Sequence, residues 1–138
     1  MLKSQSQTNE VVDTIEVART QANAKNLAEA NRLLTLFTAN KNDVNAFRLH
    51  AHVLYWMKDF RGSQDVFKKT LSIFPNEQVV KLDYGRVLYE LGKLNQAKPL
   101  LDDYKLYDTD NPRVNILLAY INYRRGHIKT ATKEFRMF

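Results

Sequence analysis

The sequence predicts an all-α fold, a right-handed α-solenoid of about four antiparallel helix pairs. Three observations predict it. Side chains of one kind recur about every 34 residues, the apolar residues between them follow helical spacing, and the 138 residues include only four glycines and three prolines. A period of this length is typical of helix-pair repeats, in which each pair buries its apolar face by stacking on the next.

The repeat is clearest in four columns of side chains, whose members are 33, 34 and 34 residues apart. Two columns hold small residues: Ala18, Ala51, Gly85 and Ala119, and Ala30, Ser63, Ala97 and Ala131. Two columns hold large apolar residues: Leu34, Phe67, Leu101 and Phe135, and Leu27, Phe60, Leu94 and Ile128. Small residues let helix backbones approach closely where they cross, and we expect the large side chains to fill the space between pairs.

The chain divides into a short lead-in and one repeat domain. Residues 1–10 are polar and are predicted to be disordered, and residues 11–138 form the domain, with repeats at about 11–43, 44–77, 78–111 and 112–138. Helical spacing of the apolar residues predicts helices over 10–24, 27–38, 44–57, 60–74, 77–91, 94–106, 112–125 and 128–138.

In the first two pairs, local signals place the helix ends. Asn26 is expected to cap the helix that begins at Leu27, and Asp43 the helix that follows the turn at residues 40–43. Pro75 ends the fourth helix, because proline cannot continue the hydrogen-bond ladder and restricts the residue before it.

In the last two pairs, glycine and proline mark the boundaries. Gly92 and Gly126 each follow a predicted helix and are expected to be left-handed C-caps. Asn111 followed by Pro112 predicts a helix start, with a capping side chain before a proline at the first helical position. Pro99 conflicts with this scheme, because it falls about one turn inside its helix. Either that helix begins later, or its first turn is kinked.

Charge and composition exclude several classes of protein. The formal charge is +6, and residues 113–138 alone hold six basic residues and one acid. These charges alternate with core positions, as on a solvated helix face, and do not form the continuous basic stripe that nucleic-acid binding needs. The absence of cysteine excludes disulfides. No apolar run approaches the roughly 18 residues of a membrane span, so we expect a soluble protein, cytoplasmic or, if a signal peptide was removed, periplasmic.

The columns resemble those of the tetratricopeptide repeat (TPR) family, which is built of antiparallel helix pairs. With Val44 as the first position of a repeat, four residues fall at the small, crossing, aromatic and closing-proline positions of the family: Ala51, Ser63, Phe67 and Pro75. The resemblance covers about residues 11–138. The chain departs from the family pattern in two ways, since only Pro75 keeps the closing proline and the first repeat lacks the turn glycine.

The resemblance implies that the first helix of each pair lines a concave groove. By position, the groove residues would be Arg19, Asn45, Arg48, His52, Tyr55, Trp56, Arg86, Tyr89, Glu90, Tyr120, Tyr123 and Arg124. Arginine, tyrosine and tryptophan are enriched at binding hot spots, because they combine a large contact area with a polar group. This mixture of cations and aromatics suits an extended peptide with carboxylates or aromatic side chains.

In this predicted groove, the role of a tyrosine repeat stays open, and the residues differ from those of chaperone-binding TPR proteins. Tyr55, Tyr89 and Tyr123 recur every 34 residues and form either a ladder along the groove or a packing contact between neighbouring repeats. The carboxylate clamp of chaperone-binding TPR proteins needs lysine and asparagine one turn apart, then asparagine, then paired basic residues. The corresponding positions here are Arg48, His52, Asp83, Arg113 and Leu117, so a co-chaperone role is not expected.

The sequence shows no catalytic or metal site. His50 and His52 are two residues apart on a helix, so they point to different faces and cannot hold one ion together. His50 falls at an inward position and is predicted to be a hydrogen-bonded core histidine. There is no cysteine nucleophile, no glycine-rich phosphate loop and no HExxH motif. We therefore expect no cofactor, no metal and no enzymatic activity.

Two functions fit this sequence. The first is a non-catalytic scaffold that binds a peptide or protein segment in the groove. The alternative is the N-terminal, periplasmic TPR region of a larger bacterial outer-membrane or exopolysaccharide-export protein, which the segment 54–60 and the Gly92 and Gly126 turns resemble. The chain ends within a predicted helix on three apolar residues, Phe135, Met137 and Phe138. We expect either that the natural chain continues, which we favour, or that this end self-associates.

Overall fold

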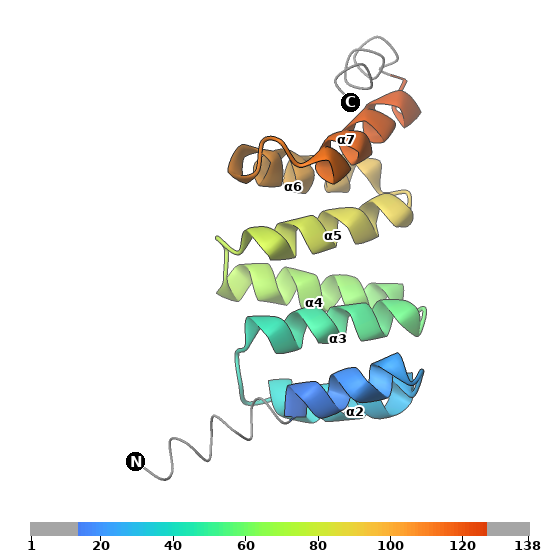
Figure 1. The fold of residues 1–138 in the computed structure, drawn as a ribbon, viewed down its shortest axis with the longest axis vertical. Helices are drawn as coiled ribbons and strands as arrows, with labels where there is room; N and C mark the ends of the chain where they lie inside the picture. The colour runs from blue at the N-terminus through green and yellow to red at the C-terminus, as the bar shows by residue number, and fades with distance from the viewer. Residues whose placement is uncertain (1–13, 127–138) are drawn as a thin grey trace. The chain divides into compact units, whose positions relative to one another are not determined.

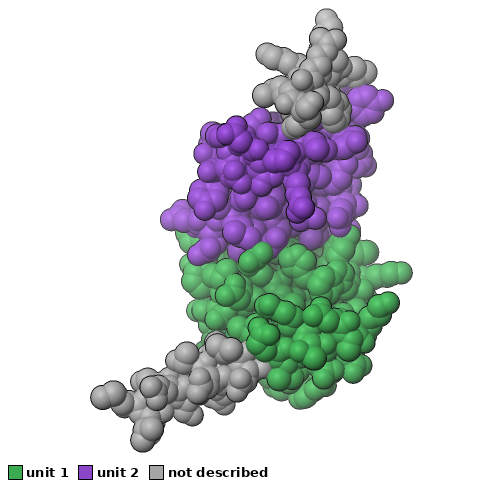
Figure 2. Space-filling model, in the orientation of Figure 1, with its two compact units in different colours: residues 1–75 green, residues 76–138 purple. Residues whose placement is uncertain are grey.

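The computed structural model describes residues 14–126, and every regular element in that range is a helix. The chain divides into two compact units, unit 1 (residues 1–75) and unit 2 (residues 76–138) (Figure 2). The helices are residues 14–23, α2 (Leu27–Thr38), α3 (Val44–Trp56), α4 (Phe60–Ile73), α5 (Gln78–Glu90), α6 (Leu94–Tyr107) and α7 (Pro112–Arg124) (Figure 1).

The predicted all-α fold is confirmed, and α2 to α7 begin and end within about one residue of the predicted bounds. The lead-in at 1–10, the start of the first helix and the predicted helix at 128–138 lie outside the described residues. Within residues 14–126, no helix is both long and apolar enough to cross a membrane.

Asparagine and aspartate side chains start three of the helices. Asp43 Oδ1 accepts a hydrogen bond from the Ala46 backbone N–H at 2.9 Å, as predicted. Asn111 also caps as predicted, because its Oδ1 accepts from the backbone N–H groups of the first turn of α7. The cap formed by Asp59 on Gly62 at 2.9 Å was not predicted. The prediction for Asn26 is wrong, since its side chain forms no cap and instead donates to Gln21.

Each helix pair turns through one residue in the left-handed backbone region. Gly92 and Gly126 have φ of 78° and 84°, as predicted, and the corresponding residues of the first two pairs are Lys25 and Lys58, with φ of 65° and 64°. At the Lys58 turn, two backbone N–H groups donate to carbonyls near the end of α3. The N–H of Lys58 donates to the carbonyl of residue 55, and the N–H of residue 59 donates to that of residue 54. This pattern satisfies the last carbonyls of the helix. The lysines adopt a conformation that glycine adopts with less strain.

Helix α6 begins at Leu94, as predicted, and continues through Pro99, so the alternative of a later start is wrong. Proline cannot donate to the carbonyl four residues earlier, at Asn95. Asn95 and Pro99 are both exposed. Water can therefore hydrogen-bond to that carbonyl, which reduces the cost of the interrupted ladder.

In unit 1, α3 packs against both α2 and α4. The small columns are closed to solvent here, with Ala18, Ala30 and Ala51 all 0% exposed. Ser63 is also fully buried, and its hydroxyl donates to the Ala51 carbonyl at 2.8 Å, so a polar small residue is tolerated at the crossing. Phe67 is fully buried, as its column predicts.

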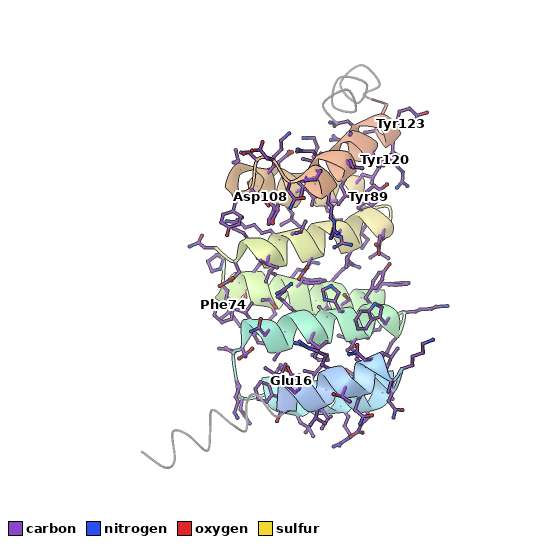
Figure 3. All side chains as sticks on the ribbon, viewed as in Figure 1. Glu16, Phe74, Tyr89, Asp108, Tyr120 and Tyr123 are labelled. Atoms are coloured by element: carbon purple, nitrogen blue, oxygen red, sulfur yellow. The ribbon has the colours of Figure 1, made fainter. Side chains whose placement is uncertain are left out.

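In unit 2, α6 packs against both α5 and α7, and α5 also contacts α7. Ala97, Leu101 and Ala119 are fully buried. At Gly85 the helices approach closely, because a Cβ placed there would lie 2.8 Å from both Cγ and Cδ2 of Leu101. The α6–α7 turn is held by Asp108 (labelled in Figure 3), whose carboxylate accepts hydrogen bonds from Asn111 and from the Tyr104 hydroxyl.

Replacing Gly85 by alanine should destabilise unit 2. Alanine normally stabilises a helix interior by about 0.5–1 kcal/mol relative to glycine. Here the added methyl group would overlap Leu101, and overpacking typically costs about 1–3 kcal/mol. Urea denaturation followed by circular dichroism would measure the change. The penalty should disappear in a Leu101→Ala background, and a Gly85→Ala chain that is more stable than the wild type would contradict this account.

Replacing Lys58 by glycine should stabilise the chain. A left-handed residue with a Cβ costs roughly 1–2 kcal/mol, whereas glycine costs about 0.5–1 kcal/mol in lost backbone entropy. We therefore expect a net gain of about 0.5–1 kcal/mol in thermal or urea unfolding. Lys68→Gly is the matched control, because Lys68 is an exposed lysine inside α4 and its replacement should destabilise. A loss of stability in both variants would show that the turn at Lys58 carries no strain.

Candidate functional site

In unit 1, α3 carries five of the predicted groove residues: besides Asn45, these are Arg48, His52, Tyr55 and Trp56 on one face. Arg48, His52 and Tyr55 are half-buried, and Trp56 is 48% exposed. The His52 ring nitrogen Nδ1 lies 2.7 Å from the Arg48 carbonyl oxygen. Because a carbonyl can only accept, Nδ1 carries the proton, and this bond holds the imidazole along the helix.

Aromatic contacts hold this face in place. The His52 ring lies between Trp56 and Phe67, with ring centroids 5.9 and 6.0 Å away. Tyr55 packs against Phe60, at the start of α4, at 5.4 Å. Trp56 therefore presents a large exposed ring, and the His52 ring beside it packs against the buried Phe67.

In unit 2, α5 and α7 bring Tyr89 and Arg124 together. The guanidinium carbon of Arg124 lies 5.6 Å from the centre of the half-buried Tyr89 ring, within range of a cation–π interaction. Tyr120 and Tyr123 of the same helix α7 are 46% and 57% exposed (Figure 3). The result is an aromatic surface with a cation over one of its rings, contributed by the first helices of two pairs.

The remaining predicted residues of unit 2, Arg86 and Glu90, lie on the exposed surface of α5. The predicted ladder of Tyr55, Tyr89 and Tyr123 spans both units and stays a prediction as a whole. Its three members differ within their own units, because Tyr55 and Tyr89 are half-buried and Tyr123 is exposed.

A pocket of about 420 Å³ lies in unit 1 between the helix of residues 14–23 and α3. It is lined by Ile15, Glu16, Arg19, Asn45 and Arg48. The helical positions of Arg19, Asn45 and Arg48 predicted that they share this face. The part played by Glu16 was missed, because one carboxylate among exposed helix residues has no distinctive spacing.

A family model described as tetratricopeptide repeat matches residues 57–131, more than half of the chain. The chain belongs to the tetratricopeptide repeat family. The match confirms the resemblance drawn from the columns of small and large residues, and it takes in α4 to α7 with their turns.

Solved TPR structures share the fold at low sequence identity. A MamA RS-1 double mutant has a TM-score of 0.81 at 19% identity, over 89% of this chain and 70% of its own. MamA 41-end from Desulfovibrio magneticus RS-1 has a TM-score of 0.70 at 19% identity, over 90% of each chain. YrrB, described as a TPR protein with an unusual peptide-binding site, has 0.77 at 16% identity, over 98% and 71%. Curated protein sequences gave no match.

His50 lies on the buried side of α3, away from the predicted groove residues of that helix. It is 8% exposed, and its Nε2 lies 2.8 Å from Asn31 Oδ1 on α2, as expected of a hydrogen-bonded core histidine. Burial lowers the pKa of His50 below its ordinary range, and the positive charge of Lys69 lowers that pKa further. Among residues 14–126, no group of three or more histidine, cysteine, aspartate or glutamate side chains is placed to hold a metal ion.

The stability of the TPR array should depend on pH through His50. Because the folded chain favours the neutral imidazole, the unfolded chain takes up the proton first as pH falls through about 6.5. The contribution of neutral His50 is therefore fully present above that pH and is lost progressively below it. We expect the urea midpoint to fall as pH is lowered from about 7 to 5.

The variant His50→Gln isolates this effect. Glutamine keeps an amide that can donate to Asn31 but does not titrate in this range. The pH slope of the urea midpoint should flatten in the variant, while the other histidines contribute equally to both chains. An unchanged slope would show that the pH dependence comes from elsewhere.

Proposed function

We propose that this TPR chain is a non-catalytic protein–protein interaction module that binds a peptide or protein segment on the outward face of its first helices. The observation that carries the proposal is the aromatic surface of unit 2, formed by Tyr89, Tyr120, Tyr123 and Arg124. Tyr120 and Tyr123 are 46% and 57% exposed on this face, because the described helix pairs use their other faces to build the core.

The chemistry of the unit 2 surface supports a protein partner. Exposed tyrosines offer a large apolar ring together with a hydroxyl, and such residues dominate the energetics of many interfaces. Arg124 lies over the Tyr89 ring within range of a cation–π interaction, so part of the entropy of ordering its side chain is already lost before binding. A guanidinium has five N–H donors, so those that do not face the ring can donate to a carboxylate or a peptide carbonyl.

Unit 1 supports the same function with its own surface. Trp56 is the largest side chain on the exposed face of α3, and its ring is 48% exposed beside His52. The half-buried Arg48 adds a cation one turn before His52 on the same face. Peptide binding needs no reacting group, and the aromatic and cationic side chains of these surfaces are sufficient for it.

A selection from a random peptide library displayed on phage tests this proposal. Synthetic peptides that the full chain selects would be measured by fluorescence anisotropy against the wild type, Tyr120→Ala and Tyr123→Ala. We expect each variant to bind about tenfold more weakly, because truncating a hot-spot side chain costs more than about 1 kcal/mol.

The matched control is Tyr107→Ala. Tyr107 is a 67% exposed tyrosine at the end of α6, a second helix, and its loss should change affinity less than about twofold. Circular dichroism would verify that all three variants are folded. The proposal is refuted if no peptide is selected, or if the selected peptides depend on Tyr107 and not on Tyr120 and Tyr123.

A further inference from the structure

A second hollow of unit 1 lies outside the predicted groove residues. Its volume is about 270 Å³, and it opens beside α2, the second helix of the first pair. We call it the α2 hollow, and its lining residues are Thr14, Leu33, Leu36, Phe37, Asn40 and Lys41. None of them belongs to the aromatic and cationic surfaces described above, so a ligand here would make contacts of its own.

The repeat columns explain why the α2 hollow exists. One column on the first helices faces one column on the second helices, and the members of both recur at 33 and 34 residues: Thr14, Phe47 and Lys81, and Leu36, Lys69 and Asp103. In the second pair, Lys69 Nζ lies 5.3 Å from the centre of the Phe47 ring. In the third pair, Lys81 Nζ lies 3.8 Å from Asp103 Oδ2. A cation over a ring and an ion pair therefore join the two columns in these pairs.

In the first pair, Thr14 and Leu36 can form neither contact, because threonine has no ring and neither residue has a charge. Phe47 is 1% exposed, whereas Leu36 is 64% exposed. A threonine side chain is also much smaller than the phenylalanine side chain of the same column. The space that Phe47 fills in the second pair is therefore left open in the first, and an exposed leucine forms one wall of it.

The α2 hollow combines apolar walls with one cation. Phe37 is 8% exposed and Leu33 is half-buried, so packing holds these two side chains in place. Lys41 Nζ lies 5.0 Å from the centre of the Phe37 ring, within range of a cation–π interaction. Of the six described residues that line the hollow, Lys41 is the charged one. A cavity of about 150 Å³ holds benzene, so the α2 hollow has room for a phenyl ring.

We propose that the α2 hollow binds a phenylalanine side chain from an acidic segment of a partner protein. The ring takes the place that Phe47 has in the second pair, where contact with the apolar walls removes it from water. Lys41 pairs with a carboxylate next to the ring, because no acid balances its charge among the described residues that line the hollow. This docking site does not depend on the peptide-binding surface of the first helices.

The test is a titration of the full chain, ¹³C-labelled at its leucine methyl groups, with N-acetyl-phenylalanyl-aspartyl amide at constant ionic strength. We expect saturable shifts of the Leu33 and Leu36 methyl signals. Leu106, an 82% exposed leucine of α6, is the internal control and should not saturate. Alanine in place of the phenylalanine of the probe should abolish the shifts. Asparagine in place of its aspartate should weaken binding about threefold, as expected for one exposed charge contact.

Two variants test the place of the ring. Thr14→Phe gives the first pair the side chain that the second pair has, so it should fill the hollow and weaken the probe about tenfold or more. The matched control is Thr20→Phe, which changes an exposed threonine of the same helix outside the hollow and should alter affinity less than about twofold. Circular dichroism would verify that both chains are folded. Leu36→Ser should weaken the probe about threefold, and the exposure of Leu36 lets the chain tolerate this change.

A third variant tests the charge. Lys41→Gln should weaken the aspartate probe about threefold and leave the affinity of the asparagine probe unchanged. The matched control is Lys68→Gln, which removes the same charge from the exposed surface of α4 and should change neither affinity.

Several results would overturn the proposal. These are an absence of saturable shifts at Leu33 and Leu36, equal shifts at Leu106, and equal binding of the alanine probe. Full affinity in Leu36→Ser or in a folded Thr14→Phe chain, or equal effects of the two lysine variants, would also contradict it. The probe does not use Tyr120 or Tyr123, so a failure here would leave the peptide selection intact, and a failed selection would leave this result intact.

Discussion

The close approach of helix backbones at the small-residue columns is the constraint on which the rest of the structure depends. In unit 1, Ala51 and Ser63 meet at such a crossing, and a buried hydroxyl-to-carbonyl bond fixes their spacing. In unit 2, Gly85 faces Leu101 so closely that a methyl group would not fit. Close crossings let the large column reach the neighbouring helix, and the fully buried Phe67 and Leu101 fill the volume that remains.

This constraint also determines which residues are available for recognition. The described helix pairs turn their small columns and the large column of Leu34, Phe67 and Leu101 inward, whereas Phe60 of the other large column is 37% exposed. The outward face of the first helix contributes little to the core. That face can hold side chains that a core would not tolerate, such as Arg19, Arg48 and the exposed rings of Trp56 and Tyr123. His50 shows the limit, because on the opposite side of α3 from this face a polar side chain is buried and needs Asn31 as a partner.

The sequence predicted the helices well and the side-chain contacts less well. Helix ends follow from local chemistry, so Asp43, Asn111, Gly92 and Gly126 were predicted correctly. Asn26 was not, because its side chain can also reach Gln21 one turn back, and sequence alone does not say which partner is chosen. The left-handed backbone conformation of Lys25 and Lys58 was not predicted for a related reason. The repeat requires a turn at these positions whichever residue occupies them.

For the candidate site too, the sequence predicted the positions of residues better than their side-chain contacts. Helical spacing predicts which residues share a face, and it placed Tyr120, Tyr123 and Arg124 together on α7. It does not predict that Arg124 lies over Tyr89, because this contact depends on rotamers and on the distance between helices. Contacts of this kind determine which partner chemistry the surface favours. A repeat array can therefore keep its columns while changing its ligand, since stability and recognition rest on different side chains.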